Sequence, residues 1–468
     1  MENNHIEEEL KKLLSSSAGV SQISVVPLAQ SGSNRRYYRL YSGDDSYIGT
    51  YVPDPAEGKC FVALARGFRQ AGREVPEVMY VSPDGRLYIQ EDLGDISLFA
   101  SLSNPDSKDN IKETLKRLVA LQQTPELFWV DKCLSNEFCK RQVMWDLNYF
   151  KYEYLKPQEI IYDEDRLEDD FERLSDRLTS IPDEFCGFMM RDCQSRNVML
   201  TERGPVFIDF QGGRRGPALY DAVSLLWQAR AGFDSELRIK MLDYFCDTFC
   251  KGNELKKKEM LSWLDEIIIF RTLQVLGAYG FRGLVQHKAH FLLSIPGALI
   301  NLHELLERGA LDQYAELKKC CLAISSDSFM EKSSEYSGLT VEIFSFSYKK
   351  GYPVDMSGNG GGFMFDCRAL HNPGRFEKYR SLTGRDKAVI EFLEDKGEIQ
   401  SFLKNAWSLI DTAIERYLSR GFTRLQVGFG CTGGQHRSVY SAERTSAHVS
   451  EKFPEVNVCL IHREHPEE

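Results

Sequence analysis

The stretch FMMRDCQSRNVMLTERGPVFIDFQGGRRGPALYD, residues 188–221, decides how the first two thirds of the chain is organised. It places one carboxylate at Asp192, an amide at Asn197 and a second carboxylate at Asp209, which follows an apolar run after a hairpin-like turn. Phosphoryl transfer uses these groups: one Asp receives or orients the proton of the attacking hydroxyl, and an Asn and another Asp hold magnesium. The spacing therefore predicts Asp192, Asn197 and Asp209 as catalytic residues, with Asn197 and Asp209 as metal ligands.

The composition narrows the class of protein. A length of 468 residues suggests about three domain-sized units, and the formal charge of −11 offers no basic field for nucleic acid. The acidic, amphipathic N-terminus is not a secretion signal, and no apolar run reaches the roughly 18 residues that a membrane span needs. The twelve cysteines contain no C-x-x-C pair and indicate free thiols. We expect a cytoplasmic protein without a nucleic-acid or membrane partner; the pattern does not encode the oligomeric state.

Residues 1–95 are expected to form a β-rich lobe that binds a nucleotide. Strands are predicted at 24–28, 37–41, 47–52, 78–81 and 86–90, and helices at 6–18 and 56–72. The polar, Gly-bearing turn before the second strand can lay backbone amides over phosphates, with Ser33, Asn34, Arg35 and Arg36 as candidate contacts. Glu91 and Leu93 lie where a strand passes into an extended connector, and they are the candidates for contact with adenine.

Residues 96–325 are expected to form a mainly helical lobe around the catalytic hairpin. Helix-spaced apolar residues occur at 109–123, 136–155, 165–179, 219–231, 234–251, 254–276 and 294–324. The aromatic residues Trp145, Tyr149 and Tyr152 are expected to lie in the core of this lobe.

This part of the chain resembles the aminoglycoside phosphotransferase and choline kinase superfamily, a relative of the protein kinase fold. The motifs SNRRYYR (33–39), RDCQSRN (191–197) and IDFQGGRRGPALYD (208–221) are most similar to those of the anomeric amino-sugar kinases. That resemblance implies ATP and Mg²⁺ as cofactors and N-acetylmuramate or N-acetylglucosamine, phosphorylated at C1 during cell-wall recycling, as substrate. It also implies that Asp192 is the catalytic base and that Asp221 supports the loop around it.

Two positions depart from the superfamily pattern. Met190 stands where a His is usual, so we expect a repacked loop rather than an inactive site. The third strand, 47–52, lacks the lysine that grips the α- and β-phosphates in kinases. An arginine from 35–39, or Lys59, is expected to take its place, and a non-catalytic pseudokinase scaffold is the alternative.

A second centre lies beyond a Ser-rich, charged linker at 326–338. Strands predicted at 340–348, 363–368, 424–429 and 457–462, with helices at 398–419 and 438–452, indicate an α/β domain with a largely parallel sheet. In such sheets ligands bind beyond the carboxyl ends of the strands.

The loop at 431–437 has the chemistry of an anion cradle. A strand runs through CTGGQHR directly into a helix, which points unpaired amides and the positive helix end at one place. Gly433 and Gly434 let the backbone curl, and His436 and Arg437 add donors. The spacing is also that of cysteine phosphatases, in which Cys431 would be the nucleophile, Arg437 the phosphate clamp and Asp366 the acid.

Residues 340–465 resemble the C-terminal domain of the RNase adapter protein RapZ. The similarity rests on SFSYKKGYPVD (345–355), FDCRALHNP (365–373), LTGRD (382–386), GCTGGQHRSVY (430–440) and HRE (462–464). It implies a sensor that binds an amino-sugar phosphate through Cys431, Thr432, Gly433, Gly434, His436, Arg437, Lys349, Arg368 and Arg463. The Gly-rich insert at 357–362 departs from that family and is expected to be a lid or a surface loop. The RNA-adapter role is not implied, because the N-terminal domain of RapZ is absent.

The sequence thus predicts an α+β, two-lobed protein-kinase-like fold followed by an α/β domain with a largely parallel sheet. The expected divisions are 1–95, 96–325, a linker at 326–338, and 339–468. The predicted function is an ATP- and Mg²⁺-dependent kinase for a small amino sugar, fused to a sugar-phosphate sensor. A bifunctional kinase and cysteine phosphatase is the second alternative.

Overall fold

The computed structural model describes residues 2–28, 34–102, 104, 106–133, 137–286, 289–292, 294–326, 339–353, 362–395, 397–420, 422 and 424–464. Ser33, nearly all of the predicted linker and all but the last residue of the Gly-rich insert lie outside these ranges. The chain divides into two compact units, Met1–Gly280 with Gly297–Ser326 and Phe281–Pro296 with Asp327–Glu468. The predicted domain limits remain predictions, and each unit is described by itself.

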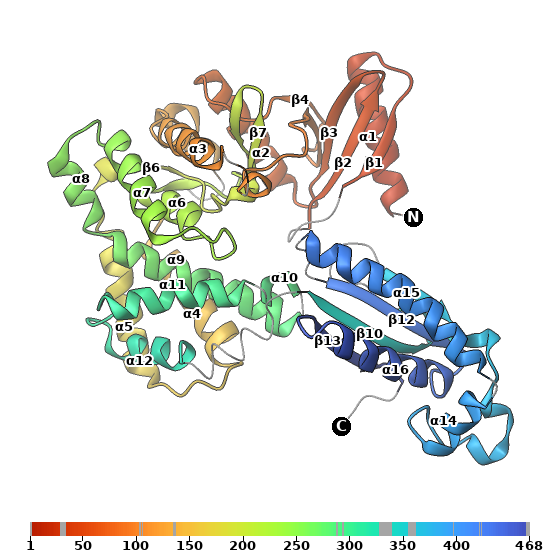
Figure 1. Cartoon of the computed structure of the whole chain (residues 1–468). Helices are drawn as coiled ribbons and strands as arrows, with labels where there is room; N and C mark the ends of the chain where they lie inside the picture. The colour runs from red at the N-terminus through yellow and green to blue at the C-terminus, as the bar shows by residue number, and fades with distance from the viewer. Residues whose placement is uncertain are drawn as a thin grey trace. The chain divides into compact units, whose positions relative to one another are not determined.

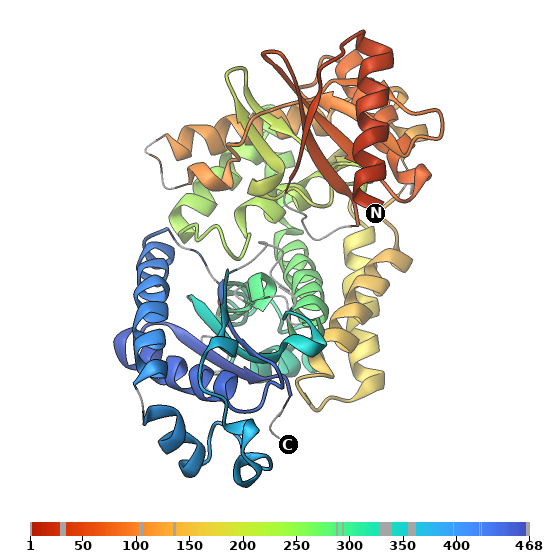
Figure 2. The ribbon, with the colours of Figure 1, turned by 90° about the vertical axis from the view of Figure 1, so that its right-hand side faces the viewer.

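The first unit begins with an antiparallel five-stranded sheet in the order β1-β2-β3-β5-β4. Its strands are β1 (Ser24–Pro27), β2 (Arg36–Ser42), β3 (Asp45–Tyr51), β4 (Val78–Val81) and β5 (Leu87–Glu91). Helix α1 (Glu2–Ala18) crosses one face of this sheet, as Figure 2 shows, and buries Leu10 and Leu14 against Leu40 and Ile89. Helix α2 (Pro55–Gln70) follows β3 directly, and the Asp54 side chain caps it by accepting the Ala56 amide.

The rest of this unit is helical apart from two short antiparallel ribbons, β6 with β9 and β7 with β8 (Figure 1). The ribbon strands are β6 (Cys186–Met189), β7 (Val198–Thr201), β8 (Gly204–Phe207) and β9 (Arg214–Pro217). The helices are α3 (Ser107–Gln122), α4 (Lys140–Phe150), α5 (Glu164–Thr179), α6 (Ala218–Leu226), α7 (Ser235–Phe249), α8 (Glu254–Leu261), α9 (Leu264–Tyr279), α11 (Ile295–Glu307) and α12 (Ala315–Ile324). This arrangement confirms the predicted two-lobed kinase-like fold.

Two details of the helical lobe differ from prediction. The segments predicted as single helices at 254–276 and 294–324 are each broken in two, the second by a turn in which Gly309 has φ of +74°. Trp145 and Tyr152 are not core residues, because their side chains are 66% and 48% exposed. Helix α4 packs on α9 through its other face, which carries Leu147, so the apolar spacing was assigned to the wrong side of the helix.

The second unit contains a four-stranded sheet in the order β11-β12-β10-β13, with every pair parallel. The strands are β10 (Thr340–Ser347), β11 (Gly362–Asp366), β12 (Arg424–Cys431) and β13 (Asn457–His462), and the helices are α10 (Ala289–Leu292), α14 (Lys387–Glu394), α15 (Glu398–Ser419) and α16 (Arg437–Lys452). Trp407 of α15 stacks on His448 of α16 with ring centroids 4.3 Å apart. The predicted parallel α/β domain is confirmed, and parallel strands bring their carboxyl ends to one edge.

Two general features concern the described residues as a whole. All twelve cysteines are free thiols, as predicted. None of the helices that the structure describes combines the length and the apolar character needed to cross a bilayer.

Candidate functional site

The three predicted catalytic residues lie together. The Asn197 amide nitrogen donates to the Asp192 carbonyl oxygen at 2.9 Å and to Asp209 Oδ2 at 3.4 Å. The Ile208 amide donates to the Asn197 carbonyl at 3.0 Å, which ties the end of β8 to the loop before β7. The Asp192 carboxylate is 56% exposed and therefore accessible to a substrate.

Backbone strain and a buried carboxylate shape this loop. Arg191 and Asp209 have φ of +73° and +63°, a conformation that is costly for residues other than glycine and is often found at functional sites. Asp221, buried in α6, accepts the amides of Met190 and Arg191 at 2.7 and 3.0 Å. Burial raises the pKa of Asp221 to about 7, although these two amides and Gln122 oppose the shift. Asp221 thus holds the loop through backbone atoms, so the loop needs no histidine at position 190.

Arg35 reaches the catalytic carboxylate from the strand-rich lobe. Its Nη2 lies 2.6 Å from Asp209 Oδ1, and its Nε lies 3.3 Å from Glu57 Oε1 at the start of α2. The Arg35 side chain is only 11% exposed. Lys59 is exposed, and its side-chain carbons lie against Gly85 in the turn before β5. Of the cations considered for the missing lysine, Arg35 is therefore the one placed beside Asp209.

The other predicted nucleotide contacts are placed as follows. Asn34 and Arg36 line a surface groove together with residues of α1, whereas Arg35 contacts Asp209. The Glu91 carboxylate is paired with Arg203 at 2.7 Å. Leu93 forms no hydrogen bond within the part of the chain that the structure describes. The contact of Glu91 and Leu93 with adenine stays a prediction.

The donors around Asp209 fit a magnesium ion that is shared with a nucleotide. Mg²⁺ is commonly held by one or two protein carboxylates together with phosphate oxygens. Asn197 spends its amide nitrogen on the two hydrogen bonds above, which leaves its Oδ1 for an ion, and Asp209 supplies a carboxylate. Among the described residues, no group of three or more His, Cys, Asp or Glu is placed to hold a metal alone. Asn197 Oδ1 and the Asp209 carboxylate therefore suit an ion whose other ligands come from phosphates.

A buried polar network behind Asp192 was not predicted from the sequence. Arg271 Nη2 lies 3.6 Å from Asp192 Oδ1, and Arg271 Nη1 donates to Gln274 Oε1 at 2.6 Å. Gln274 in turn donates to Asp146 at 2.7 Å, and Asp146 pairs with Arg191 at 3.0 Å. A charged residue directly after an apolar run in α9 is the sequence signal that indicates Arg271. Through Arg191 and Asp192, the network holds the catalytic loop in place.

In the second unit, the loop after β12 surrounds the Cys431 sulfur with donors. The Gly434 amide lies 3.2 Å from Sγ, and the Ser438 hydroxyl lies 3.1 Å from it. Burial opposes ionisation of the Cys431 thiol, but the hydrogen bonds from Ser438 and from the amides of Ser438, Gln435 and Gly434 outweigh it and lower the pKa. The Ser347 hydroxyl donates to the Thr432 carbonyl at 2.8 Å and joins the loop to the end of β10.

The predicted cationic residues lie at or beside this edge of the sheet, but their side chains have different partners. His436 is buried with Nε2 2.8 Å from the Tyr379 carbonyl. Arg437 is buried and donates from Nη1 to the carbonyls of Arg368 and Leu370, both at 2.9 Å. No carboxylate lies within ion-pair distance of Arg437 in the described ranges.

The remaining candidates follow the ends of the other three strands. Lys349 follows β10 and is exposed. Arg463 follows β13 and donates to the Gly351 carbonyl at 3.0 Å. Arg368 follows β11 and pairs with Asp366 through two nitrogens. The hydrogen bond from Arg368 is the largest of the contacts that lower the pKa of Asp366, which makes this carboxyl a poor proton donor.

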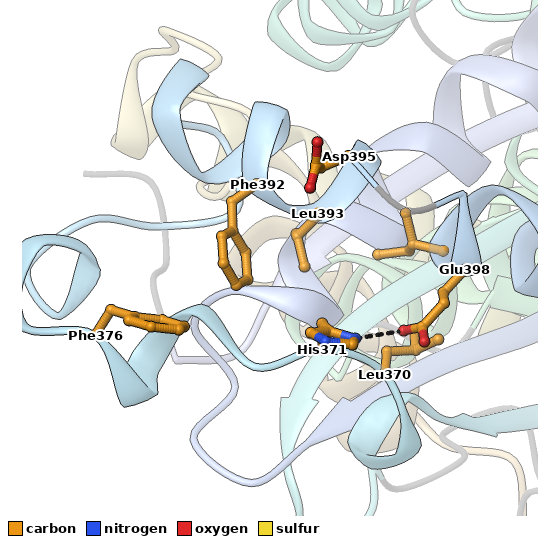
Figure 3. A pocket seen from close by; sticks show the side chains of 8 residues that line it. Leu370, His371, Phe376, Phe392, Leu393, Asp395 and Glu398 are labelled. Atoms are coloured by element: carbon orange, nitrogen blue, oxygen red, sulfur yellow. Dashed lines mark hydrogen bonds and ion pairs between the residues drawn. The ribbon is translucent and has the colours of Figure 1, made fainter.

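A separate cavity of about 160 Å³ lies nearby in the same unit (Figure 3). Its lining is mainly apolar and includes Phe376, Phe392 and Leu393. His371 Nδ1 and Glu398 Oε2 face each other across its polar side at 2.8 Å. None of the predicted phosphate contacts lines this cavity.

Two segments of the chain match models of known protein families. Residues 24–255 match the model of the phosphotransferase enzyme family, and residues 339–466 match the model of the RapZ C-terminal domain. Both resemblances seen in the sequence are thereby confirmed for these segments.

Curated relatives and solved structures give more limited matches. A nucleotide-binding protein of Lactobacillus acidophilus is 38% identical over 125 residues, 27% of this chain and 40% of its own length. One from Xanthomonas axonopodis pv. citri is 40% identical over 127 residues, 27% of this chain and 43% of its own. The chain thus spans about two fifths of these relatives. A choline kinase structure from Cryptosporidium parvum has a TM-score of 0.49 at 11% identity and covers 66% of this chain and 99% of that one. One from Streptococcus pneumoniae has 0.44 at 14%, covering 64% and 99%.

Proposed function

We propose that this chain, which joins a segment matching the phosphotransferase enzyme family to one matching the RapZ C-terminal domain, is a small-molecule kinase. It transfers phosphate from ATP, with Mg²⁺, to a hydroxyl of an amino sugar. N-acetylmuramate and N-acetylglucosamine, phosphorylated at C1, are the proposed acceptors. The C-terminal domain binds a sugar phosphate and senses a product or downstream metabolite.

One observation carries the kinase assignment. The Asn197 side chain donates to the backbone carbonyl of Asp192 and to the carboxylate of Asp209, which gathers the three residues whose types phosphoryl transfer uses. The ion pair of Arg35 with the same Asp209 adds a cation from the strand-rich lobe. A non-catalytic scaffold has no need to keep Arg191 and Asp209 at positive φ in the two segments that flank the β7–β8 ribbon.

The chain's own residues divide the work as follows. Asp192 accepts the proton of the acceptor hydroxyl. Arg271, whose Nη2 lies 3.6 Å from Asp192 Oδ1, orients the Asp192 carboxylate. Asn197 and Asp209 hold the magnesium, which neutralises charge on the phosphates when bound. Arg35 contacts the phosphates in place of the lysine absent from β3.

The choice of amino sugars rests on two independent resemblances. The motifs of residues 33–39, 191–197 and 208–221 are most similar to those of anomeric amino-sugar kinases. The C-terminal segment matches the RapZ C-terminal domain, and that resemblance implies an amino-sugar phosphate as the ligand. Buried Arg437 has no carboxylate of the described residues within ion-pair distance, and its Nε has no partner there, which supports an anion beside the 431–437 loop.

The kinase assignment is tested by ADP formation from MgATP with N-acetylmuramate, N-acetylglucosamine and glucosamine. We expect turnover with an N-acetylated sugar that Asp192→Ala lowers at least 1000-fold. Tight MgATP binding without turnover on any sugar would refute the amino-sugar assignment, and no nucleotide binding at all would favour the scaffold.

A cysteine phosphatase remains the competing function for the C-terminal domain, because donors lower the pKa of Cys431. The pairing of Asp366 with Arg368 argues against it, since the reaction needs an acid for the leaving group. Phosphate release from glucosamine 6-phosphate decides between them. A sensor releases none, whereas a phosphatase releases phosphate that Cys431→Ser abolishes.

A further inference from the structure

Arg214 is a buried cation that has no acidic partner among the residues that the structure describes. It begins β9 and its side chain is 7% exposed. Within the described part of the chain its one hydrogen bond runs from Nη2 to the Gly212 carbonyl at 3.3 Å, and its Nε has no partner there. No carboxylate of the described residues lies within 4 Å of its guanidinium, and burial lowers its pKa. A buried charge without a counter-ion is costly, and binding of an anion from solution would offset that cost.

The neighbouring residue shows what a fully paired arginine looks like on the same strand. Arg215 Nε lies 2.6 Å from Glu126, and its Nη1 lies 3.0 Å from Asp183. Successive side chains of a strand point to opposite faces, so the two arginines serve different surroundings. The lack of an acidic partner is therefore specific to Arg214 and is not a property of β9.

Arg214 lines an open pocket of about 700 Å³, here called the Arg214 pocket. Its lining is Glu137, Cys139, Arg141, Gln142, Trp145, Asp146, Arg191 and Arg214. Asp146 is already neutralised by Arg191, at 3.0 Å. Three arginines therefore face two carboxylates, and one of those carboxylates is already paired.

The pocket also has an apolar wall and adjoins the catalytic loop. Trp145, an exposed aromatic side chain on α4, supplies a flat surface of the kind that ligand pockets often contain. Arg191 precedes Asp192 in the chain, and Asp146 connects to Asp192 through Gln274 and Arg271. A ligand in this pocket is therefore connected to the proposed base, Asp192, through the polar contacts of Asp146, Gln274 and Arg271.

We propose that the Arg214 pocket binds a carboxylate or phosphate group of a small molecule through Arg214 and Arg141, with the rest of the ligand against Trp145. Arginine suits this role because its planar guanidinium matches both oxyanions. If the ligand is the acceptor, the pocket selects a sugar with an acidic substituent, such as N-acetylmuramate, over neutral N-acetylglucosamine. That choice of acceptor rests on the proposed function; the anion site does not.

The test is calorimetric titration of the full-length protein, without ATP, with N-acetylmuramate, its neutral methyl ester and inorganic phosphate. We expect at least one of the two anions to bind, with an affinity that Arg214→Met lowers at least 10-fold and Arg215→Met leaves within 3-fold. Binding of N-acetylmuramate at least 10-fold tighter than its ester identifies the acceptor as the source of the anion. Arg214-dependent binding of phosphate alone identifies a separate anionic effector.

The proposal is overturned if neither anion binds, or if binding is equal in Arg214→Met and wild type. Should Arg214→Met fail to fold by circular dichroism, Arg141→Met and the acid-to-ester ratio on the wild-type protein decide the question. The readout needs no turnover. Failure of phosphate transfer to every sugar, despite MgATP binding, would therefore refute the amino-sugar assignment while leaving Arg214-dependent anion binding intact.

Discussion

Replacing Arg35 tests whether it substitutes for the lysine missing from β3. The wild-type guanidinium contacts Asp209 at 2.6 Å and Glu57 at 3.3 Å. A hydrogen bond to a charged group contributes about 1.5–3 kcal/mol, which corresponds to roughly 10- to 150-fold in a dissociation constant. Arg35→Met should therefore weaken binding of ATP by that factor, and Arg35→Lys should restore part of the affinity.

The assay is fluorescence titration with an ATP analogue, which requires no acceptor. Arg86→Met is the matched control, because Arg86 lies in the same lobe beside an acidic partner, Asp84, at 3.7 Å, but on the exposed turn before β5. Unfolding by urea should show a loss of about 1–3 kcal/mol in Arg35→Met, since neither of its carboxylate partners is fully buried. Equal ATP affinities in Arg35→Met and Arg86→Met would refute the assignment.

Three further predictions follow from the same contacts. Because burial raises the pKa of Asp221 to about 7, the folded state binds more protons than the unfolded state between about pH 4 and 7. This carboxyl therefore lowers the unfolding free energy by up to roughly 4 kcal/mol as pH rises through that window. Urea titrations should show that the unfolding free energy of Asp221→Asn depends less on pH, and an unchanged pH dependence would contradict the burial argument. Gly434→Ala should destabilise the 431–437 loop and lower the affinity for glucosamine 6-phosphate at least 10-fold, since φ of Gly434 is +71° and a Cβ would lie 3.0 Å from the Ser347 amide. Gly433→Ala, whose Cβ enters open space, should leave the melting temperature unchanged. Equal melting temperatures of the two variants would argue against a strained position at Gly434. Removal of Mg²⁺ with EDTA should abolish sugar phosphorylation and Mn²⁺ should restore it, and activity that survives EDTA would contradict the roles of Asn197 and Asp209.

Local spacing predicted what depends on neighbouring residues in the chain. The distance from Asp192 to Asn197 and the place of Asp209 after a strand are set within one hairpin, so the sequence sufficed to bring them together. Parallel strands end at one edge whatever their order. That rule alone placed the 431–437 loop beside the residues that follow β10 and β11.

Features that depend on distant contacts were not predictable in the same way. The sequence offered several cations near position 35, and the choice of Arg35 required knowing which of them faces Asp209 across the two lobes. The apolar spacing of α4 did not say which face meets α9, so Trp145 was assigned to the core. Arg214 and Arg215 are equivalent in the sequence, and only the positions of Glu126 and Asp183 distinguish them.

The most direct test of the central claim is phosphorus NMR of the protein with ATP, Mg²⁺ and N-acetylmuramate or N-acetylglucosamine. We predict a new sugar 1-phosphate resonance, coupled to the anomeric proton, that grows as ADP forms and is absent with Asp192→Asn. Nucleotide resonances alone, in the presence of bound MgATP, would contradict the account. So would product formation that Asp192→Asn leaves unchanged.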